Sequence, residues 1–259
     1  FTRLLALSLA AIAPLAHADE MVRYDGDQVI RVEIDSLRAL RTMLALSPDC
    51  WSEAAGLGTL DFRMPADRMA ALKKTDINFT VLIPDLQALL DEEQARLAAA
   101  EGGIAGASFF SDYHRTTEIF DFYDNLVATH PALASMSVIG TSIEGRDIRR
   151  YTIGAGDLAT TPAVYITALA HAREWISPAT MAFVTDRLVS GYGSDPRITD
   201  ILDHVTFHVV AVSNPDGYEY TWDENRLWRK TRRNNGDGTY GVDWNRNFSA
   251  GWGGPGSSG

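Results

Sequence analysis

The stretch AVYITALAHAREWISP, residues 163–178, decides the fold, because it passes from the pattern of a strand to that of a helix. Residues 163–169 form a continuous apolar run, which is typical of a strand in the buried middle of a sheet. Ser177 and Pro178 then predict an N-cap followed by proline at the first helical position, with the helix running through Leu188. The intervening residues follow the carboxyl end of a strand, where α/β folds place their ligands.

That connection contains a candidate metal site. His171 and Glu174 are three residues apart and can both ligate one zinc ion. The spacing alone is a weak signal, because a surface histidine near a surface glutamate gives the same pattern by chance. The preceding strand and Arg173 inside the motif favour the metal site.

Residues 225–233, NRLWRKTRR, concentrate positive charge. The plain interpretation of such a run is a solvated basic stretch. If the segment is helical, however, Arg226 and Arg229 flank Trp228 and line one wall together. A guanidinium fixed near a metal can stabilise the oxyanion that forms when water attacks a carbonyl.

Asn245 and Arg246 offer a second kind of site, since an adjacent amide and guanidinium can grip a carboxylate in a planar, bidentate way. A metal beside a carboxylate clamp predicts an enzyme that cuts next to the C-terminus of a peptide.

Composition sets limits on the alternatives. The 259 residues are 46% hydrophobic and 22% charged, enough for a substantial core in one large domain or two smaller ones. The net charge of -11 disfavours nucleic-acid binding, because such a surface repels phosphate. The single cysteine, Cys50, excludes an internal disulfide and is interpreted as a small buried hydrophobe.

Residues 1–18 read as a secretory signal. Arg3 precedes a short apolar run at 4–13, and Ala16-His17-Ala18 has the small-x-small pattern of a cleavage site. The run is too short for a spanning helix, although a membrane anchor is the alternative. We therefore expect a secreted, extracellular protein, or a periplasmic one in a bacterium, with no membrane partner. Because the first residue is Phe1, we expect the start of the gene product to be missing.

Residues 19–99 predict a small α+β domain in the order strand, helix, strand, helix, strand, helix, with an open antiparallel sheet covered on one face. The predicted strands are residues 29–34, 59–64 and 77–83. Asp35 and Pro65 are expected to open the first two helices. Residues 100–108, within an Ala- and Gly-rich stretch, predict a linker that can be cut during maturation, with Arg96 as one cleavage point.

The second unit, residues 109–259, predicts a helix after Thr117, two strands at 136–139 and 148–153, and a second buried strand at 205–212. The pentapeptide NPDGY, residues 214–218, is expected to end that last strand in a tight turn. His204 and His208 are expected to share one face of the strand, in a structural role.

Four ordered motifs resemble the zinc carboxypeptidase A/B family, and the match runs from about Tyr113 to the last residue. The motifs are AHAREWI at 170–176, NPDGY at 214–218, NRLWRKTR at 225–232 and VDWNRNF at 242–248. Residues 24–99 resemble the activation domain of the family's pro-forms. The resemblance implies an α/β catalytic domain with a mixed, mostly parallel central sheet flanked by helices.

The resemblance also implies roles for particular residues. His171 and Glu174 match two of the three zinc ligands of a His₂Glu site, as in carboxypeptidase A. Arg229 matches the arginine that polarises the scissile carbonyl. The substrate-binding positions are Arg173 and Arg226 in the outer subsites and Asn245 and Arg246 at the terminal carboxylate. Peptide and protein C-termini are the implied substrates, and the activation domain is the implied intramolecular inhibitor.

The chain departs from the family pattern at its end. The family's third ligand, a histidine, and its general-base glutamate lie further along than Gly259, so we expect a fragment truncated at both ends. Two other interpretations stay open: a binding module that lacks the base, and a zinc amidohydrolase acting on non-protein amides. The preference for aromatic, aliphatic or basic terminal residues is not readable from this sequence.

Overall fold

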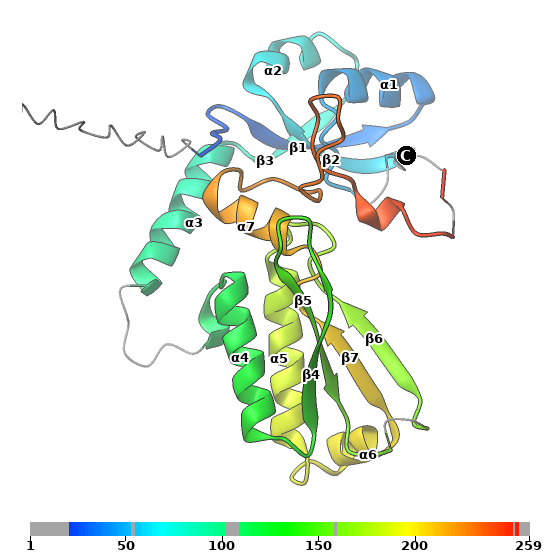
Figure 1. Ribbon diagram of the computed structural model, residues 1–259. Helices are drawn as coiled ribbons and strands as arrows, with labels where there is room; N and C mark the ends of the chain where they lie inside the picture. The colour runs from blue at the N-terminus through cyan, green and yellow to red at the C-terminus, as the bar shows by residue number, and fades with distance from the viewer. Residues whose placement is uncertain (1–20, 53–54, 102–108, 158–159, 251, 254–259) are drawn as a thin grey trace, which may run out of the picture.

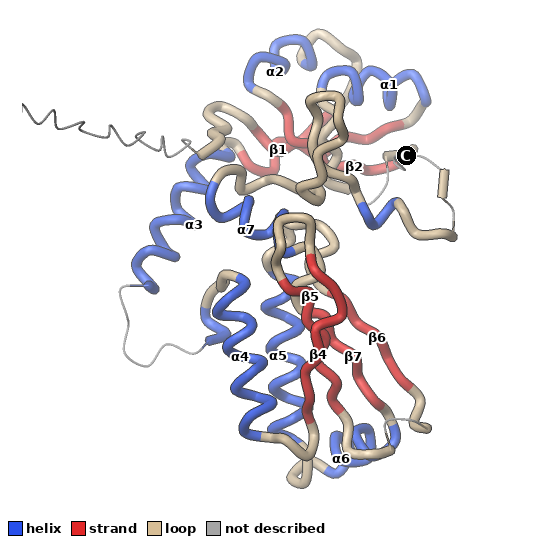
Figure 2. Tube along the Cα trace, in the orientation of Figure 1, coloured by secondary structure: helices blue, strands red, loops and turns tan. Residues whose placement is uncertain are grey.

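Two units are joined by a long helix in the computed structural model, which describes residues 21–52, 55–101, 109–157, 160–250 and 252–253. Figure 1 shows a small sheet with two helices in the N-terminal unit (21–52 and 55–101) and a larger layered arrangement in the C-terminal unit (109 onward). Figure 2 shows that loops dominate where the two units face each other. None of the described helices combines the length and apolar character that crossing a bilayer requires.

The N-terminal unit is an antiparallel α+β arrangement, as the sequence predicts. Strand β1 (Gln28–Ile34) lies between β2 (Gly58–Met64) and β3 (Phe79–Ile83), with antiparallel pairing on both sides. Helices α1 (Leu37–Leu46) and α2 (Ala66–Leu72) lie on the same side of this sheet (Figure 1). Their apolar faces and the sheet enclose one core, formed by Ile30, Val32, Ile34, Met43, Leu60, Phe62, Met64 and Leu72.

The caps of these helices differ slightly from expectation. Ser36, and not Asp35, caps α1, because its side chain accepts a hydrogen bond from the Ala39 N–H at 3.2 Å. Pro65 lies at the N-cap of α2, one residue before its expected place.

Helix α3 (Leu86–Glu101) links the two units. It includes Ala100 and Glu101, the first two residues of the predicted linker, because alanine supports a helix once it has begun. The rest of the predicted linker, 102–108, lies outside the described residues. Leu86 and Leu90 pack in a small cluster of the N-terminal unit, whereas Leu97 packs in the core of the C-terminal unit. Helix α3 therefore packs against side chains of both units.

The C-terminal sheet is mixed, but the prediction that it is mostly parallel is wrong for the described strands. The order is β4 (Ala134–Thr141), β5 (Asp147–Ile153), β7 (Thr206–Val210), β6 (Ala163–Thr167). Only β6 and β7 pair in parallel, whereas the other two pairings are antiparallel. The short turn between β4 and β5, with Gly145 at a φ of +88°, forces a hairpin, and only the connection through helices permits a parallel pair.

Helices cover one face of this sheet. Helices α4 (Thr116–Thr129) and α5 (Ile176–Gly191) lie side by side there, and α6 (Pro196–His204) closes the lower end (Figure 1). The short helix η1 (Phe109–Ser111) contacts α5. The core beneath them includes Ile119, Tyr123, Tyr151, Ile153, Trp175, Leu202, Val209 and Tyr218.

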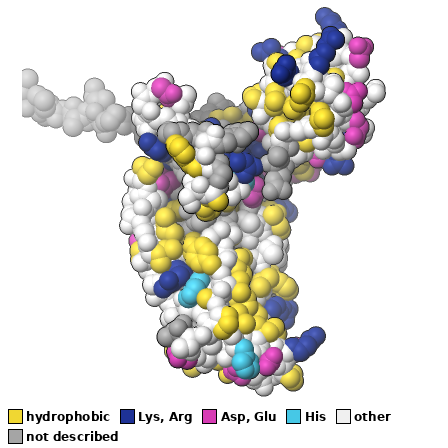
Figure 3. Space-filling model, turned by 90° about the vertical axis from the view of Figure 1, so that its right-hand side faces the viewer, with side chains coloured by type: hydrophobic (Ala, Val, Ile, Leu, Met, Phe, Trp, Pro, Cys, Tyr) yellow, Lys and Arg dark blue, Asp and Glu magenta, His cyan; other side chains and the backbone are white. Residues whose placement is uncertain are grey.

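Strand β6 was predicted to lie in the buried middle of a sheet, but it is an edge among the described strands. Val164 and Tyr165 are exposed, and β7 is its neighbour on one side. Figure 3, which views the side of the molecule where β6 lies, shows apolar side chains gathered over the C-terminal unit.

Three local predictions need correction. Helix α5 begins at Ile176 with Trp175 at the N-cap, so Ser177 and Pro178 lie inside its first turn. Asn214 does not open a tight turn but caps helix α7 (Pro215–Asp223), accepting from the Gly217 N–H at 3.2 Å. His204 ends α6, so it does not share a strand with His208, which lies in β7.

Candidate metal centre and substrate cleft

The loop that follows β6 brings the predicted metal-binding residues together. Leu169 adopts a φ of +59°, the left-handed region that non-glycine residues rarely occupy. Its N–H donates to the Ser177 hydroxyl at 3.0 Å, and the Ala172 N–H donates to the Arg229 carbonyl at 3.0 Å. The turn is therefore fixed at both ends, and it presents His171 and Glu174 beside the segment that carries Arg229.

The side chains of His171 and Glu174 point toward each other and lie within hydrogen-bonding distance. The His171 ring is buried, and its Nδ1 lies 2.7 Å from Glu174 Oε1. Its other nitrogen, Nε2, lies 3.2 Å from Asp243 Oδ1. A metal ion bound at Nδ1 would leave the ring proton on Nε2, where the Asp243 carboxylate can accept it.

Asp243 is a site residue to which the sequence analysis gave no role. It is separated from His171 by 72 positions, and it directly precedes the short helix η2 (Trp244–Arg246). Histidines that bind metal usually donate their second N–H to a carboxylate, which fixes the tautomer and the ring orientation. A free carboxylate inside the VDWNRNF motif was the only signal available from the sequence.

The donor set fits zinc in type, since imidazole nitrogen and carboxylate oxygen are both zinc ligands. Within the described ranges, no group of three or more His, Cys, Asp or Glu side chains is arranged to hold a metal. His171 and Glu174 could therefore supply two ligands to a metal ion, and the described residues around them do not complete a shell.

Both carboxylates at the site have lowered pKa values. Burial acts to raise the pKa of Glu174, but the hydrogen bond from His171 and the charges of His171, Arg229 and Arg173 bring it below its ordinary value. Burial likewise opposes ionisation of Asp243, but the charges of Arg229 and His171 hold its pKa low. Both groups are therefore ionised at neutral pH, the form that binds a cation and orients an imidazole.

Arg229 lies beside the metal-binding pair. Its Nε and Nη2 are each 3.1 Å from Asp243 Oδ2, and its Nη1 is 3.8 Å from Glu174 Oε1. The segment is not helical, since α7 ends at Asp223. The guanidinium is instead fixed by Asp243, beside the Glu174 carboxylate.

Close backbone contacts hold the segment of Arg229 in place. A Cβ on Gly217 would lie 2.5 Å from the Lys230 carbonyl oxygen, so only glycine allows α7 to pack there. Gly241, at a φ of +84°, would meet the Thr231 carbonyl oxygen at 2.4 Å in the same way. Thr231 and Val242 are joined by a backbone hydrogen bond of 3.1 Å. The loop therefore closes on itself and brings Asp243 back to Arg229.

Asn245 and Arg246, the predicted carboxylate clamp, come shortly after Asp243 in the chain. Asn245 and Arg246 belong to η2, whose first turn is closed by the Arg246 N–H donating to the Asp243 carbonyl at 2.9 Å. The Asn247 amide also donates to the Asp243 carbonyl, at 2.8 Å. Both clamp residues are half-buried and lie within one helical turn of the carboxylate that contacts His171. The structure thus brings the clamp and the metal-binding pair into one neighbourhood.

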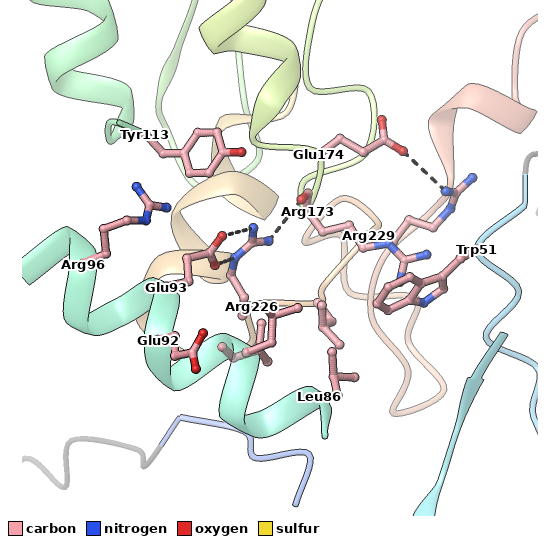
Figure 4. Close-up of a pocket in the computed structure, with 13 residues that line it drawn as sticks. Trp51, Leu86, Glu92, Glu93, Arg96, Tyr113, Arg173, Glu174, Arg226 and Arg229 are labelled. Carbon is pink, nitrogen blue, oxygen red and sulfur yellow. Dashed lines mark hydrogen bonds and ion pairs between the residues drawn. The ribbon is translucent and has the colours of Figure 1, made fainter. Parts of the chain in front are cut away.

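Arg173 and Arg226 both contact acidic residues of the N-terminal unit. Arg173 Nη1 lies 3.1 Å from Asp49 Oδ1, and the guanidinium lies 5.4 Å from the Trp51 ring centroid. Arg226 makes a bidentate pair with Glu93 of α3, at 2.5 and 3.1 Å (Figure 4).

A cavity of about 580 Å³ lies between the two units at this point. Arg173, Glu174, Arg226 and Arg229 line it from the C-terminal unit, as Figure 4 shows. The opposite wall comes from the N-terminal unit and consists of Trp51, Leu86, Leu89, Leu90, Glu92, Glu93 and Arg96. Glu174 belongs both to this lining and to the pair with His171, and Arg229 lies beside it. The N-terminal unit therefore covers the side of the cavity from which the pair is reached.

Residues 119–259 match the model of the family described as zinc carboxypeptidase. The chain belongs to the zinc carboxypeptidase family. It is similar to carboxypeptidase A1 of Sus scrofa, with 39% identity over 90% of this chain and 59% of the relative. It is also 36% identical to carboxypeptidase A2 of Rattus norvegicus, over 98% of this chain and 63% of the relative.

Two solved structures share the fold. The carboxypeptidase A from Helicoverpa armigera has a TM-score of 0.75 and 27% identity, over 89% of this chain and 59% of that one. The thrombin activatable fibrinolysis inhibitor has a TM-score of 0.74 and 25% identity, over 87% and 59%. The chain spans about three fifths of the length of the relatives that it matches.

Proposed function

We propose that the full-length protein is a secreted zinc carboxypeptidase, made as a zymogen, that hydrolyses the C-terminal peptide bond of peptides and proteins. The observation that carries this proposal is the arrangement around His171: Nδ1 faces Glu174, and Nε2 is held by a carboxylate that also binds Arg229. The family membership supports the same reaction.

His171 and Glu174 are the residues that would hold the zinc ion. When bound, zinc polarises a carbonyl and acidifies a water molecule toward neutral pKa. Asp243 would keep the imidazole in the tautomer whose Nδ1 is free to bind. A third ligand and a general base would complete the site, and the described residues provide neither beside His171 and Glu174.

Arg229 and the clamp would supply the remaining functions. The Arg229 guanidinium is held in place before substrate arrives, so it can stabilise negative charge on the scissile carbonyl oxygen without reorganising. Asn245 and Arg246 would bind the terminal carboxylate of the substrate in a bidentate way. Only a chain end carries a free α-carboxylate, and the clamp therefore makes the enzyme an exopeptidase.

The N-terminal unit would act as the intramolecular inhibitor. Trp51 and α3 form the wall of the cavity opposite Arg173, Arg226 and Arg229, so they would obstruct a peptide that binds along these arginines. We infer a signal at 1–18, an activation domain at 19–99 and a linker at 100–108. Arg96 lies within α3 and pairs with Asp112, so a protease must unwind the helix to cut there, and the linker is the better cleavage point.

The proposal is tested with peptides that differ only at the chain end, assayed on the activated full-length protein. A peptide with a free C-terminus should be hydrolysed, and its amidated form should be a poor substrate. Arg246→Ala should raise KM strongly for the free peptide and change little for the amide. An equal loss on both peptides would contradict the clamp. Hydrolysis of an N-acyl amino acid in preference to peptides would indicate the amidohydrolase, and binding without hydrolysis would indicate the binding module.

A further inference from the structure

Charge is divided between the two walls of the cavity. The C-terminal unit contributes Arg173 and Arg226, whereas the carboxylates that neutralise them, on Asp49 and Glu93, come from the N-terminal unit. In a chain whose net charge is -11, this lining is locally positive once the N-terminal unit is removed. The released cleft would therefore attract negative charge.

Arg226 is held in position by the C-terminal unit alone. Its guanidinium lies 3.6 Å from the centroid of the Trp175 ring, and its Nη1 donates to the Arg173 carbonyl at 3.0 Å. Trp175 is itself stacked on Trp222 with centroids 4.0 Å apart, and its indole N–H donates to the Thr221 hydroxyl at 2.8 Å. None of these partners belongs to the N-terminal unit, so the guanidinium keeps its orientation when Glu93 departs.

The remaining edge of the guanidinium, Nε and Nη2, is the one that Glu93 occupies. This edge presents two parallel donors to the two oxygens of one carboxylate, and both side chains are less than a fifth exposed. A planar pair of this kind selects a carboxylate over a neutral amide, because the charged acceptor forms stronger hydrogen bonds with a cation. We call the Arg226 edge, the Trp175 ring and the Arg173 carbonyl the carboxylate pocket.

We propose that the carboxylate pocket determines substrate specificity, by binding an Asp or Glu side chain upstream of the bond that is cut. In the zymogen, Glu93 occupies the pocket in place of that side chain. The pocket and Arg229 line the same cavity, so a peptide lying in the cleft can reach both. This inference rests on the proposed function for the identity of the ligand as a peptide, and it adds the substrate class.

The test measures peptide binding without turnover. The full-length protein is cleaved between α3 and α4, freed of its N-terminal unit and stripped of zinc with a chelator. The fluorescent peptides have a free C-terminus and otherwise uncharged side chains. Each carries one Glu, or Gln in its place, at one position from the second to the fifth from the end. Fluorescence anisotropy should give about tenfold tighter binding of the Glu peptide at one position.

Two variants and the uncut protein provide the controls. Arg226→Gln should reduce the ratio between the Glu and Gln peptides to near one, whereas Arg233→Gln, an exposed cation of the same segment, should keep it. In uncut protein, Glu93 fills the pocket and the ratio should also be near one. A ratio near one at every position in the parent, or an unchanged ratio in Arg226→Gln, would overturn the proposal. A preserved ratio without hydrolysis in the zinc-loaded enzyme would contradict only the proposed function.

A second measurement needs no cleavage. Glu93→Ala empties the pocket in the intact chain, and acetylglutamate amide, whose one charge is its side-chain carboxylate, should then raise the thermal unfolding midpoint. Acetylglutamine amide should not, and neither compound should act on the double variant Glu93→Ala/Arg226→Gln. Equal effects of both compounds, or an unchanged effect in the double variant, would also overturn the proposal.

Discussion

The N-terminal and C-terminal units contribute to the cavity between them in opposite ways. The N-terminal unit supplies carboxylates and apolar side chains to the cavity, and its sheet has a separate core of its own. The C-terminal unit supplies Arg173, Arg226 and Arg229. Two of these are also fixed by contacts within their own unit, Arg229 by Asp243 and Arg226 by Trp175. The candidate site residues therefore belong to the C-terminal unit, whereas the N-terminal unit neutralises Arg173 and Arg226 and covers the cavity.

The largest expected effect is on the stability of the N-terminal unit alone. Phe62 is fully buried in the N-terminal core, so Phe62→Ala should cost about 3–5 kcal/mol, a large fraction of the stability of a unit of about eighty residues. The N-terminal unit should unfold first in urea, with the C-terminal unit still protected from hydrogen exchange. Leu57→Ala, at an exposed position of the same unit, should change stability by less than about 0.5 kcal/mol. Simultaneous unfolding of both units in the Phe62 variant would show that the cores are not independent.

The next effect concerns the contact between the units. Glu93→Ala leaves Arg226 without its carboxylate partner and should weaken docking of α3 by about 2 kcal/mol, because unpairing a mostly buried charge is costly. Glu92→Ala, one residue earlier on the same helix and exposed, is the matched control. Hydrogen exchange of α3 amides should speed up in the first variant alone. Equal acceleration in both would mean that the ion pair does not hold the units together.

A smaller effect depends on pH. Burial acts to raise the pKa of Asp49, but Arg173 and Arg63 lower it below its ordinary value. A carboxylate with a lowered folded pKa stabilises the protein fully above its unfolded pKa of about 3.9, and the contribution is lost as pH falls through the folded value. Asp49→Asn should therefore lower stability at pH 7 by roughly 1–2 kcal/mol. Urea midpoints of the variant and the parent should converge as the pH falls below the unfolded pKa, and a difference that stays constant over that range would contradict the ion-pair explanation.

The smallest effect is expected away from the cavity. Arg31 and Asp61 form a cross-strand pair at 2.8 Å in the N-terminal sheet, and the Arg31 side chain is half exposed. Arg31→Ala should change stability by less than about 1 kcal/mol, and by still less in high salt. A loss as large as that of Glu93→Ala would mean that ion pairs at the cavity have no special importance.

Local chemistry made much of the fold readable from the sequence. The three N-terminal strands follow from runs of β-branched and aromatic residues, and α3 follows from its leucine stripe. The errors in the C-terminal sheet arose because the position and direction of a strand depend on which strands it pairs with. Nothing in residues 163–169 indicates that β7 alone among the described strands pairs with them, and the antiparallel pairing of β5 with β7 depends on contacts distant in sequence. The cap at Asn214 was readable, because Asn followed by Pro and Asp has the signature of a helix start.

The residues of the candidate site also differ in how far the sequence reveals them. His171 and Glu174 could be identified because both lie in one short motif, and their side chains do meet. Asp243 could not be identified, since a carboxylate 72 positions away reaches His171 only after the loop from Arg229 has closed. Glu93 and Asp49 were also beyond sequence reasoning, because their partners lie in the other unit.

The central claim is that His171 and Glu174 hold zinc in a cleft lined by Arg173, Arg226 and Arg229 of the same unit. Elemental analysis of the full-length protein, freed of its leader, tests it most directly. We predict one zinc ion per chain, loss of the metal in His171→Ala, and affinity lowered about 10–100-fold in Asp243→Asn. A protein without stoichiometric zinc, or one that keeps its zinc in His171→Ala, would contradict the account.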